Sequence, residues 1–235
     1  MYKAKQEIWA VVPCKRLEFS NRRLMTVLSV VERQRLACLM LEDVLGGLVN
    51  SGYLRGIFIA SDDPVVKDIA SSFGARCLQS FEDVGLSSAL TNASSLLAEE
   101  GAHGIVAVHA DLPLLTSEDI NPVIRGIIEN PAITLVPADK DLGTNVLAMS
   151  PPGIIEYAFG KKSSLRHAMA ARARRIEPTF IKTSHLSFDI DTPDDLLQFV
   201  QSPSDTNTFR YLTESGIRDR ILRFGTNHLQ HEAVG

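Results

Sequence analysis

The sequence has no glycine-rich phosphate cradle, because neither G-x-G-x-x-G nor a Walker motif occurs in its 235 residues. Any phosphate recognition must therefore use side-chain cations, backbone amides or a metal ion. Cysteine is scarce as well: Cys14, Cys38 and Cys77 are widely spaced. An odd number at such spacing fits neither a disulfide framework nor a zinc site. We expect reduced thiols in a cytoplasmic protein.

Long apolar runs and blocks of one charge are also missing. The N-terminal segment MYKAKQEIWAVVP contains an apolar run too short for a signal peptide or a membrane span. A net charge of -4 without like-sign blocks gives no footprint for nucleic acid. No linker-like run divides the chain, so we expect one domain over residues 1–235, with a core at about 8–200 and a helical tail at 201–235. The oligomeric state stays open, and a homodimer is compatible with the sequence.

Short apolar, β-branched runs alternate with segments of helical period. This alternation predicts an α/β fold in three layers, α/β/α, around a mixed but mostly parallel sheet. The expected strands are 8–12, 56–60, 75–78, 104–109 and 133–136, and the expected helices are 32–48, 64–73, 87–99 and 117–128. Further on, we expect strands at 145–149 and 186–190 and a basic helix at 164–175, and this whole region should fold over the sheet edge. Two short helices are expected around Gly216.

One carboxylate at a predicted strand end has no structural explanation. Asp111 follows a buried strand in AVHADLPLLTSED, where an unpaired charge would be costly. Asp119 differs, because Thr116 and Asp119 form a T-x-x-D capping box for the next helix. Ligands of open α/β sheets collect at the carboxyl ends of strands. Asp111 is therefore a candidate catalytic or metal-binding residue.

Two further acids lie in HLSFDIDTPDDL. Asp189 and Asp191 alternate with apolar residues, so a strand would place both on one face. A divalent cation would relieve their repulsion, and Mg²⁺ favours one or two carboxylates plus water and phosphate oxygens. Thr192 and Asp195 form another capping box, so Asp194 and Asp195 are interpreted as structural. The alternative for Asp189 and Asp191 is a charge pair near the helix dipole.

A basic loop follows the first predicted strand in VPCKRLEFSNRRL. Its cations, Lys15, Arg16, Arg22 and Arg23, indicate a grip on a triphosphate, and a solvated basic loop is the alternative. In SDDP, Asp63 reads as a helix N-cap before proline, while Asp62 either contacts a nucleotide or serves the turn.

Small and hydroxyl residues precede two predicted helices. Gly85 is followed by serines, including Ser88, that either face a ligand or cap the helix. The segment from DLGTN to FGKKSS predicts an anion pocket beside a helix start; its members are Thr144, Asn145, Gly160, Ser163 and Ser164. Basic helix faces are usually solvated, which is the ordinary interpretation of Lys161, Lys162 and His167. His109, at a strand end, is interpreted as packed rather than catalytic.

Taken in order, VPCK with RRL, SDDP, VGLSSAL, ADLPLL, DLGTN, AFGKKS and FDIDTPDDL resemble the CofC/FbiD family of 2-phospholactate guanylyltransferases over roughly residues 8 to 200. The resemblance implies the nucleotidyltransferase fold shared with nucleotide-diphospho-sugar transferases. It also implies a guanylyltransferase of coenzyme F-420 biosynthesis, which couples GTP to a phosphorylated three-carbon acid and releases pyrophosphate. The sequence does not choose among phosphoenolpyruvate, 2-phospho-L-lactate and 3-phospho-D-glycerate.

The resemblance also assigns roles to individual residues. It implies Mg²⁺ binding by Asp111, Asp189 and Asp191. It implies that Thr144, Gly160 and Ser163 hold the acid's carboxylate and that Lys15, Arg23 and Gly85 contact GTP. Further candidates are Asn145 and Ser164 for acid binding, Val12, Asp62 and Ser88 for nucleotide binding, and Lys15, Arg23 and Asp111 for catalysis. The sequence departs from the family pattern at Cys14 and Ser87, which leaves the base contacts open.

Two other functions remain alternatives. Asp189-Ile190-Asp191 is formally a D-x-D motif, as in metal-dependent glycosyltransferases of related fold. Its late position and the separate Asp111 argue against that reading. A nucleotide-binding module without catalysis is the second alternative. For transfer to a phosphate no base is needed, because the phosphate is already ionised at neutral pH.

Overall fold

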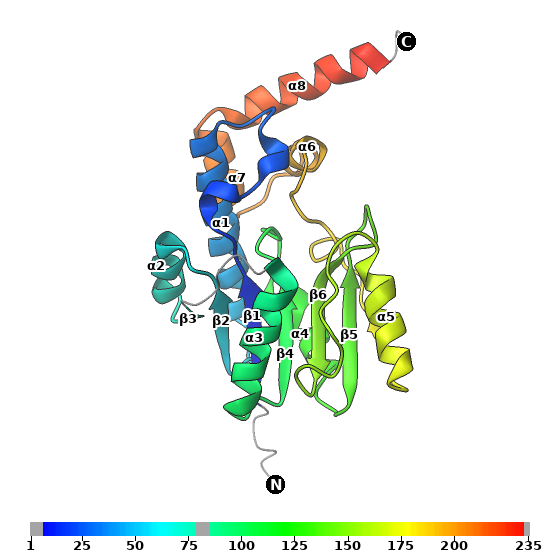
Figure 1. The fold of residues 1–235 in the computed structure, drawn as a ribbon. Coiled ribbons are helices and arrows are strands. Elements are labelled where there is room, and N and C mark those ends of the chain that lie inside the picture. The colour runs from blue at the N-terminus through cyan, green and yellow to red at the C-terminus, as the bar shows by residue number, and fades with distance from the viewer. Residues whose placement is uncertain (1–6, 79–84, 233–235) are drawn as a thin grey trace.

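The strands form one seven-stranded sheet in the order β3-β2-β1-β4-β6-β5-β7 (Figure 1). The computed structural model describes residues 7–78 and 85–232, excluding the side chains of 226–232. Strand β6 runs antiparallel to β4 and β5, and the other pairs are parallel. The predicted mixed, mostly parallel sheet is therefore confirmed. The strands are β1 (Ile8–Pro13), β2 (Gly56–Ala60), β3 (Arg76–Leu78), β4 (Gly104–Val108), β5 (Ala132–Pro137), β6 (Thr144–Ser150) and β7 (Thr179–Phe180).

Helices cover both faces of the sheet, as predicted. Along β1, Ala10 and Val12 face one apolar cluster with helices α1, α2 and α4, whereas Val11 faces another with α3 and α5. This alternation follows from the two-residue period of a strand. The helices are α1 (Val30–Val49), α2 (Pro64–Ser72), α3 (Gly85–Glu99), α4 (Ser117–Arg125), α5 (Ser163–Ala173), α6 (Pro193–Gln201), α7 (Asn207–Glu214) and α8 (Ile217–Glu232), with 3-10 turns η1 (Leu17–Phe19) and η2 (Arg22–Leu24).

The C-terminal helices form a third apolar cluster beyond the sheet (Figure 1). Leu36 and Met40 of α1 pack there against Phe199 of α6 and Leu212 of α7. Asp43 accepts hydrogen bonds from the first amides of α7, at 2.8 Å for Asn207 and 2.9 Å for Thr208. The tail is thus attached to α1. Among the described helices, none combines the length and apolar character needed to cross a bilayer.

Two later segments differ from expectation. The predicted strand at 145–149 exists, but β6 lies inside the sheet between β4 and β5 instead of over its edge. The expected strand at 186–190 is wrong: no regular strand forms there. Its backbone groups form hydrogen bonds with three different segments instead of with one neighbouring strand. Leu186 O accepts from Asn145 Nδ2, Ser187 O accepts from the Asp139 amide, and the Ile190 amide donates to Asp111 O. The two helices around Gly216 form as predicted, although α8 is not short.

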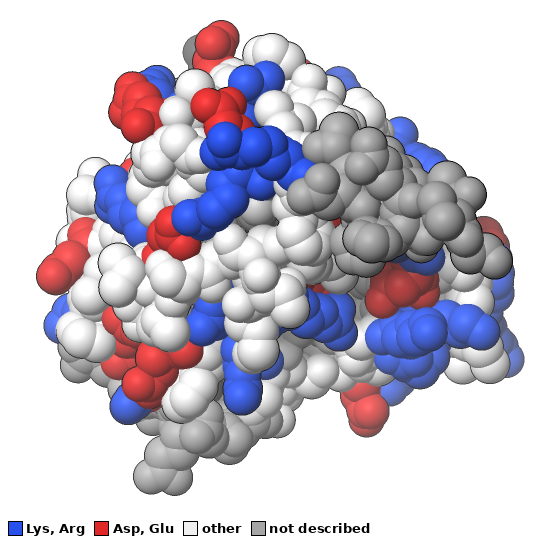
Figure 2. All heavy atoms as spheres, turned by 90° about the horizontal axis from the view of Figure 1, so that it is seen from above, with Lys and Arg blue, Asp and Glu red and all other residues white. Residues whose placement is uncertain are grey.

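The strand order reverses between β1 and β4. From β1 the chain runs outward through β2 to β3, and then returns to place β4 on the other side of β1. In open α/β sheets the crevice outside the carboxyl ends of two such strands binds ligands, because the connecting loops diverge there. From this end, Lys and Arg side chains are interspersed with acids (Figure 2). Surface charge alone therefore does not mark a ligand site, and the candidate ligand-binding cations are those beside the crevice.

Candidate active site

A cavity of about 390 Å³ opens at this reversal. It is lined by segments that follow β1 and β4, by α1, by the start of α3 and by the segment before α6. Lys15 and Arg23 bring positive charge, and Asp111 and Asp191 bring negative charge. Four of the predicted site residues therefore share one cavity, although they lie up to 176 positions apart in the chain (191 − 15).

A backbone hydrogen bond places the late acidic segment beside Asp111. The Ile190 amide donates to Asp111 O at 3.1 Å. Ile190 itself is fully buried and packs in the cluster of the C-terminal helices. The hydrophobic side chain therefore anchors the segment, while its two flanking acids are held at the end of β4.

Asp111 has the strongest need for a positive partner. Its Oδ1 is buried and has no hydrogen-bond partner among the described residues, and His109 Nδ1 is 4.0 Å away. Burial, and then the charges of Asp189 and Asp191, raise the pKa of the Asp111 carboxyl to about 7. An unpaired carboxylate in such a place is costly unless a cation joins it.

Asp189 and Asp191 have different partners. Asp189 accepts a hydrogen bond from Asn145 Nδ2 at 3.3 Å, and burial raises the pKa of its carboxyl. Asp191 pairs with Arg23 and lines the cavity. Across residues 7–78 and 85–225, no three His, Cys, Asp or Glu side chains converge closely enough to hold a metal ion. The three predicted acids are thus brought to one end of the sheet without forming a closed cluster.

Asp195 and Asp119, interpreted as structural, have that role in the structure. Thr192 and Asp195 form the predicted capping box at the start of α6, and Asp194 is exposed in the first turn of that helix. Thr116 accepts from the Asp119 amide at the start of α4. Asp119 also contacts His185 Nδ1 at 2.8 Å, a link that ties the segment before Asp189 to α4.

Only some of the predicted nucleotide-binding residues lie at the cavity. Gly85 opens α3 with φ +79, a conformation that suits glycine, and the next residue, Leu86, lines the cavity. Val12 is fully buried in β1, and Ser88 is exposed on α3. Asp62 lies outside the cavity lining and accepts a hydrogen bond from Arg16 Nε at 2.9 Å.

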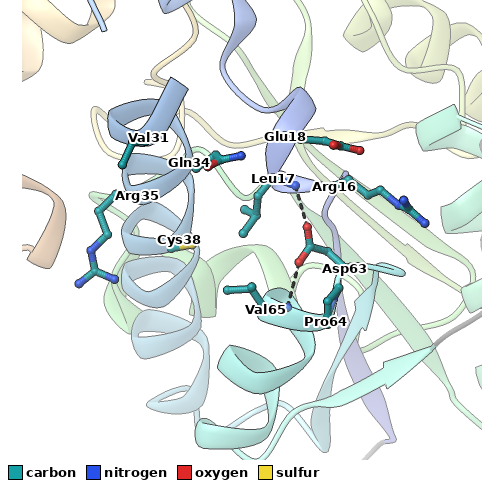
Figure 3. A pocket seen from close by; sticks show the side chains of 10 residues that line it. All are labelled: Arg16, Leu17, Glu18, Val31, Gln34, Arg35, Cys38, Asp63, Pro64 and Val65. Atoms are coloured by element: carbon teal, nitrogen blue, oxygen red, sulfur yellow. Dashed lines mark hydrogen bonds between the residues drawn. The ribbon is translucent and has the colours of Figure 1, made fainter. Parts of the chain in front are cut away.

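A second, larger cavity of about 590 Å³ lies between η1, α1 and the start of α2 (Figure 3). Asp63 lies between η1 and α2, and its carboxylate accepts the amides of Leu17 and Val65, both at 2.9 Å. Asp63 is therefore the predicted N-cap. Arg16 and Arg35 are directed away from each other (Figure 3). Because the Asp63 carboxylate is committed to backbone amides and the two arginines diverge, this larger cavity is a weaker candidate for triphosphate binding.

The hydroxyl residues predicted to bind an anion lie together at the starts of β6 and α5. Thr144, Ser163 and Ser164 are at most 2% exposed. Ser163 Oγ donates to Thr144 Oγ1 at 2.9 Å. The Ser163 and Ser164 amides already donate to Gly160 O and Leu142 O, so an anion there would meet side-chain hydroxyls before helix amides. Gly160 has φ +116, which few other residues tolerate.

His167 is not on a solvated helix face, which was the ordinary expectation for it. It is fully buried, with Nδ1 3.0 Å from Thr144 Oγ1 and Nε2 accepting the Ala158 amide at 2.9 Å. The apolar positions of α5 that pack on the sheet carry His167 inward with them. Lys161 and Lys162 are exposed as expected.

Phe159 lies between His109 of the cavity and the buried His167, and the sequence did not predict this position. Its ring centroid is 5.1 Å from His109, which lines the cavity, and 5.1 Å from His167. His109 is packed as predicted, and burial lowers its pKa to about 4. The only sequence signal for Phe159 was its place before Gly160 in AFGKKS.

The chain is similar to known proteins in sequence and in fold. A phosphoenolpyruvate guanylyltransferase of Rubrobacter xylanophilus is 35% identical over 83% of this chain and 94% of its own. A 3-phospho-D-glycerate guanylyltransferase of Phenylobacterium zucineum is 28% identical over 83% of this chain and 90% of its own. A solved structure from Desulfovibrio desulfuricans G20, named after the nucleotide-diphospho-sugar transferases, covers 92% of this chain and 98% of its own with TM-score 0.73 and 16% identity.

The likeness to the Desulfovibrio desulfuricans structure concerns the fold alone, and it agrees with the architecture predicted from the resemblance. The family model described as guanylyl transferase CofC like matches residues 8–227, which includes every segment around the cavity. The chain therefore belongs to the CofC-like guanylyl transferases and is a nucleotidyltransferase.

Proposed function

We propose that this protein transfers a guanylyl group from GTP to the phosphate of a phosphorylated three-carbon acid. The observation that carries the proposal is the shared cavity of Lys15, Arg23, Asp111 and Asp191 at the strand-order reversal. Cations beside acids suit a triphosphate that arrives with a divalent metal. Membership of the guanylyl transferase family supports GTP as the donor.

The reaction forms one bond and breaks one. A phosphate oxygen of the acid attacks the α-phosphorus of GTP, and the bond from that phosphorus to the bridging oxygen of pyrophosphate breaks. The nucleophile is already ionised at neutral pH, so no protein base is needed. His109 would be a poor base in any case, because burial lowers its pKa to about 4. The residues are left with alignment and charge neutralisation, for which Lys15 and Arg23 are suited.

We propose Mg²⁺ as the metal and Asp111 with Asp191 as its first ligands. The buried, unpartnered Oδ1 of Asp111 and its raised pKa fit a site that needs a cation, and both side chains line the cavity. Asp189 would join them by exchanging its contact with Asn145. When bound, Mg²⁺ would supply charge neutralisation for the phosphates. Arg23 would then be free to exchange Asp191 for the triphosphate.

The acid's carboxylate is proposed to lie at Thr144, Gly160 and Ser163, with Asn145 and Ser164 behind them. Thr144 and Ser163 supply hydroxyls, and the ring of Phe159 lies between His167, which contacts Thr144, and His109 in the cavity. This arrangement would present the phosphate of a short acid toward the nucleotide, so the acid must carry a carboxylate and a phosphate on a small carbon skeleton. The relatives named above act on phosphoenolpyruvate and 3-phospho-D-glycerate, and 2-phospho-L-lactate has the same two groups.

The test is pyrophosphate release by the purified protein with GTP, MgCl₂ and each of the three acids separately, with product mass by mass spectrometry. We expect a guanylyl diphosphate-linked acid with at least one of them, and more slowly or not at all with ATP, CTP or UTP. Transfer or hydrolysis with a nucleotide sugar but none with GTP and any acid would contradict the proposal. So would GTP binding with no turnover.

A further inference from the structure

We propose that His167 is a positioning residue for the acid's carboxylate: its ring holds Thr144 so that the threonine hydroxyl can only donate a hydrogen bond. This inference rests on the proposed function, which has the carboxylate at Thr144. His167 does not reach the reacting atoms in this role. It acts through Thr144 Oγ1, 3.0 Å from its Nδ1.

The tautomer of His167 is set by the main chain. The Ala158 amide can only donate, and it donates to His167 Nε2 at 2.9 Å. Burial, followed by the charge of Arg166, lowers the pKa of His167 to about 4, so the ring carries one proton at neutral pH. That proton must be on Nδ1, and Nδ1–H therefore donates to Thr144 Oγ1.

The loop that supplies the Ala158 amide is itself held. Arg166, one position before His167, donates through Nη2 to Ala158 O at 2.8 Å and through Nη1 to Lys161 O at 2.7 Å. These bonds span Gly160, whose φ of +116 lets the loop turn back toward α5. The backbone that fixes the His167 tautomer is thus tied to the same helix.

Thr144 receives two hydrogen bonds at one oxygen. Ser163 Oγ donates at 2.9 Å and His167 Nδ1 donates at 3.0 Å. A hydroxyl oxygen has two lone pairs, so both are used. The remaining group of Thr144 is its own O–H. Among residues 7–78 and 85–225, this hydroxyl donates no observed hydrogen bond. A carboxylate oxygen, which only accepts, is the complementary ligand.

Two substitutions test the two ring nitrogens of His167 separately. His167→Asn retains a side-chain amide near the Nδ1 position that can donate to Thr144, whereas His167→Gln retains an acceptor near Nε2 and loses that donation. We expect His167→Gln to raise the KM for the phospho-acid by about 10-fold, the effect of losing one buried hydrogen bond. The KM for GTP should change less than about 2-fold. His167→Asn should recover most of the acid KM.

Thr144→Val supplies the coupling test. If His167 acts through Thr144, adding His167→Gln to Thr144→Val should raise the acid KM by no more than about 2-fold, because the bond is already lost. The matched control is Tyr157→Phe, which removes another buried hydrogen bond of the same segment, to Ser94 Oγ at 2.6 Å. It should alter thermal stability and leave both KM values unchanged.

The tautomer is measured without any substrate. The ¹⁵N chemical shifts of the His167 ring, assigned with the His167→Gln variant, should show Nδ1 protonated and Nε2 unprotonated at pH 7. An Nε2-protonated ring overturns the inference even if the protein turns over none of the acids. Equal effects of His167→Gln on the KM for acid and for GTP, equal effects of the Asn and Gln variants, or additivity with Thr144→Val also overturn it in an active protein. If His167→Gln does not fold, the Asn variant, the coupling with Thr144→Val and the wild-type tautomer still decide.

Discussion

Lys140, in the loop between β5 and β6, pairs with Asp195 in the first turn of α6. Asp195 is 2% exposed, and its Oδ2 accepts the amides of Asp191 at 3.2 Å and Thr192 at 2.7 Å. Burial alone would raise the pKa of this carboxyl, but hydrogen bonds from Lys140 and Thr192 lower it. Asp195, a member of the α6 capping box, therefore also holds the backbone of Asp191, a candidate metal ligand.

Replacing Lys140 by methionine should weaken both the fold and the site. A buried carboxylate would lose its cation, but Lys140 is half-exposed, so we expect the free energy of unfolding to fall by only about 1 kcal/mol. The lowered pKa means that the pair is fully charged above the ordinary pKa of 3.8, so the loss is present at pH 7. Activity should fall roughly 10-fold, since Asp191 loses part of its anchor.

The matched control for this variant is Lys182→Met. Lys182 pairs with Asp139 at 2.7 Å, with both side chains largely exposed. Its removal should change the free energy of unfolding by less than about 0.5 kcal/mol. Urea unfolding at pH 7 measures both variants. Equal losses would mean that the contact of Lys140 with Asp195 is no more than another surface pair.

Asp111→Asn should stabilise the metal-free protein at alkaline pH while abolishing turnover. The folded-state pKa of about 7 lies above the ordinary 3.8, so the folded protein binds this proton more tightly than the unfolded chain does. The contribution of Asp111 to stability is therefore present below about pH 4 and is lost as pH rises through about 7. Asparagine does not titrate, so the variant escapes this loss.

The measurement is urea unfolding of wild type and Asp111→Asn in EDTA at pH 5 and pH 8. The difference in free energy of unfolding, variant minus wild type, should be larger at pH 8 by about 2 kcal/mol. Adding MgCl₂ at pH 8 should stabilise the wild type and leave the variant nearly unchanged. A difference that does not vary with pH would mean that Asp111 is not the proton-binding group.

Much of the fold could be predicted because its signals are local. Apolar runs of β period and capping residues such as Asp63 and Thr192 gave most strands and helix starts correctly. The strand prediction at 186–190 was wrong because the alternation of apolar and acidic residues there reflects anchoring of the apolar side chains in the third apolar cluster. Ile190 is anchored in the third apolar cluster, and no neighbouring strand pairs with the segment.

The site was predictable only as far as residue type and strand ends allow. Asp111 and the Lys15 loop follow strands whose carboxyl ends meet, so their convergence could be expected. The contact of Lys140 with Asp195 joins distant segments through side chains and has no periodic signal. The burial of His167 depends on which face of α5 packs against the sheet, and its basic neighbours obscured that face.

Asp189 and Asp191 offer the most direct test of the proposed metal site. Asp191→Asn removes a carboxylate that lines the cavity and pairs with Arg23, and Asp189→Asn removes the one that Asn145 holds. We expect each to lower Mg²⁺-dependent pyrophosphate release by on the order of 100-fold, because charge neutralisation at the phosphates is the main catalytic requirement. The fold should persist, as neither side chain is part of an apolar cluster. Asp194→Asn is the matched control: it is an exposed acid of the same segment and should retain full activity. If both Asp189→Asn and Asp191→Asn were as active as Asp194→Asn, the carboxylates would have no role in metal binding, and the charges at this end of the sheet would serve only the helix that follows them.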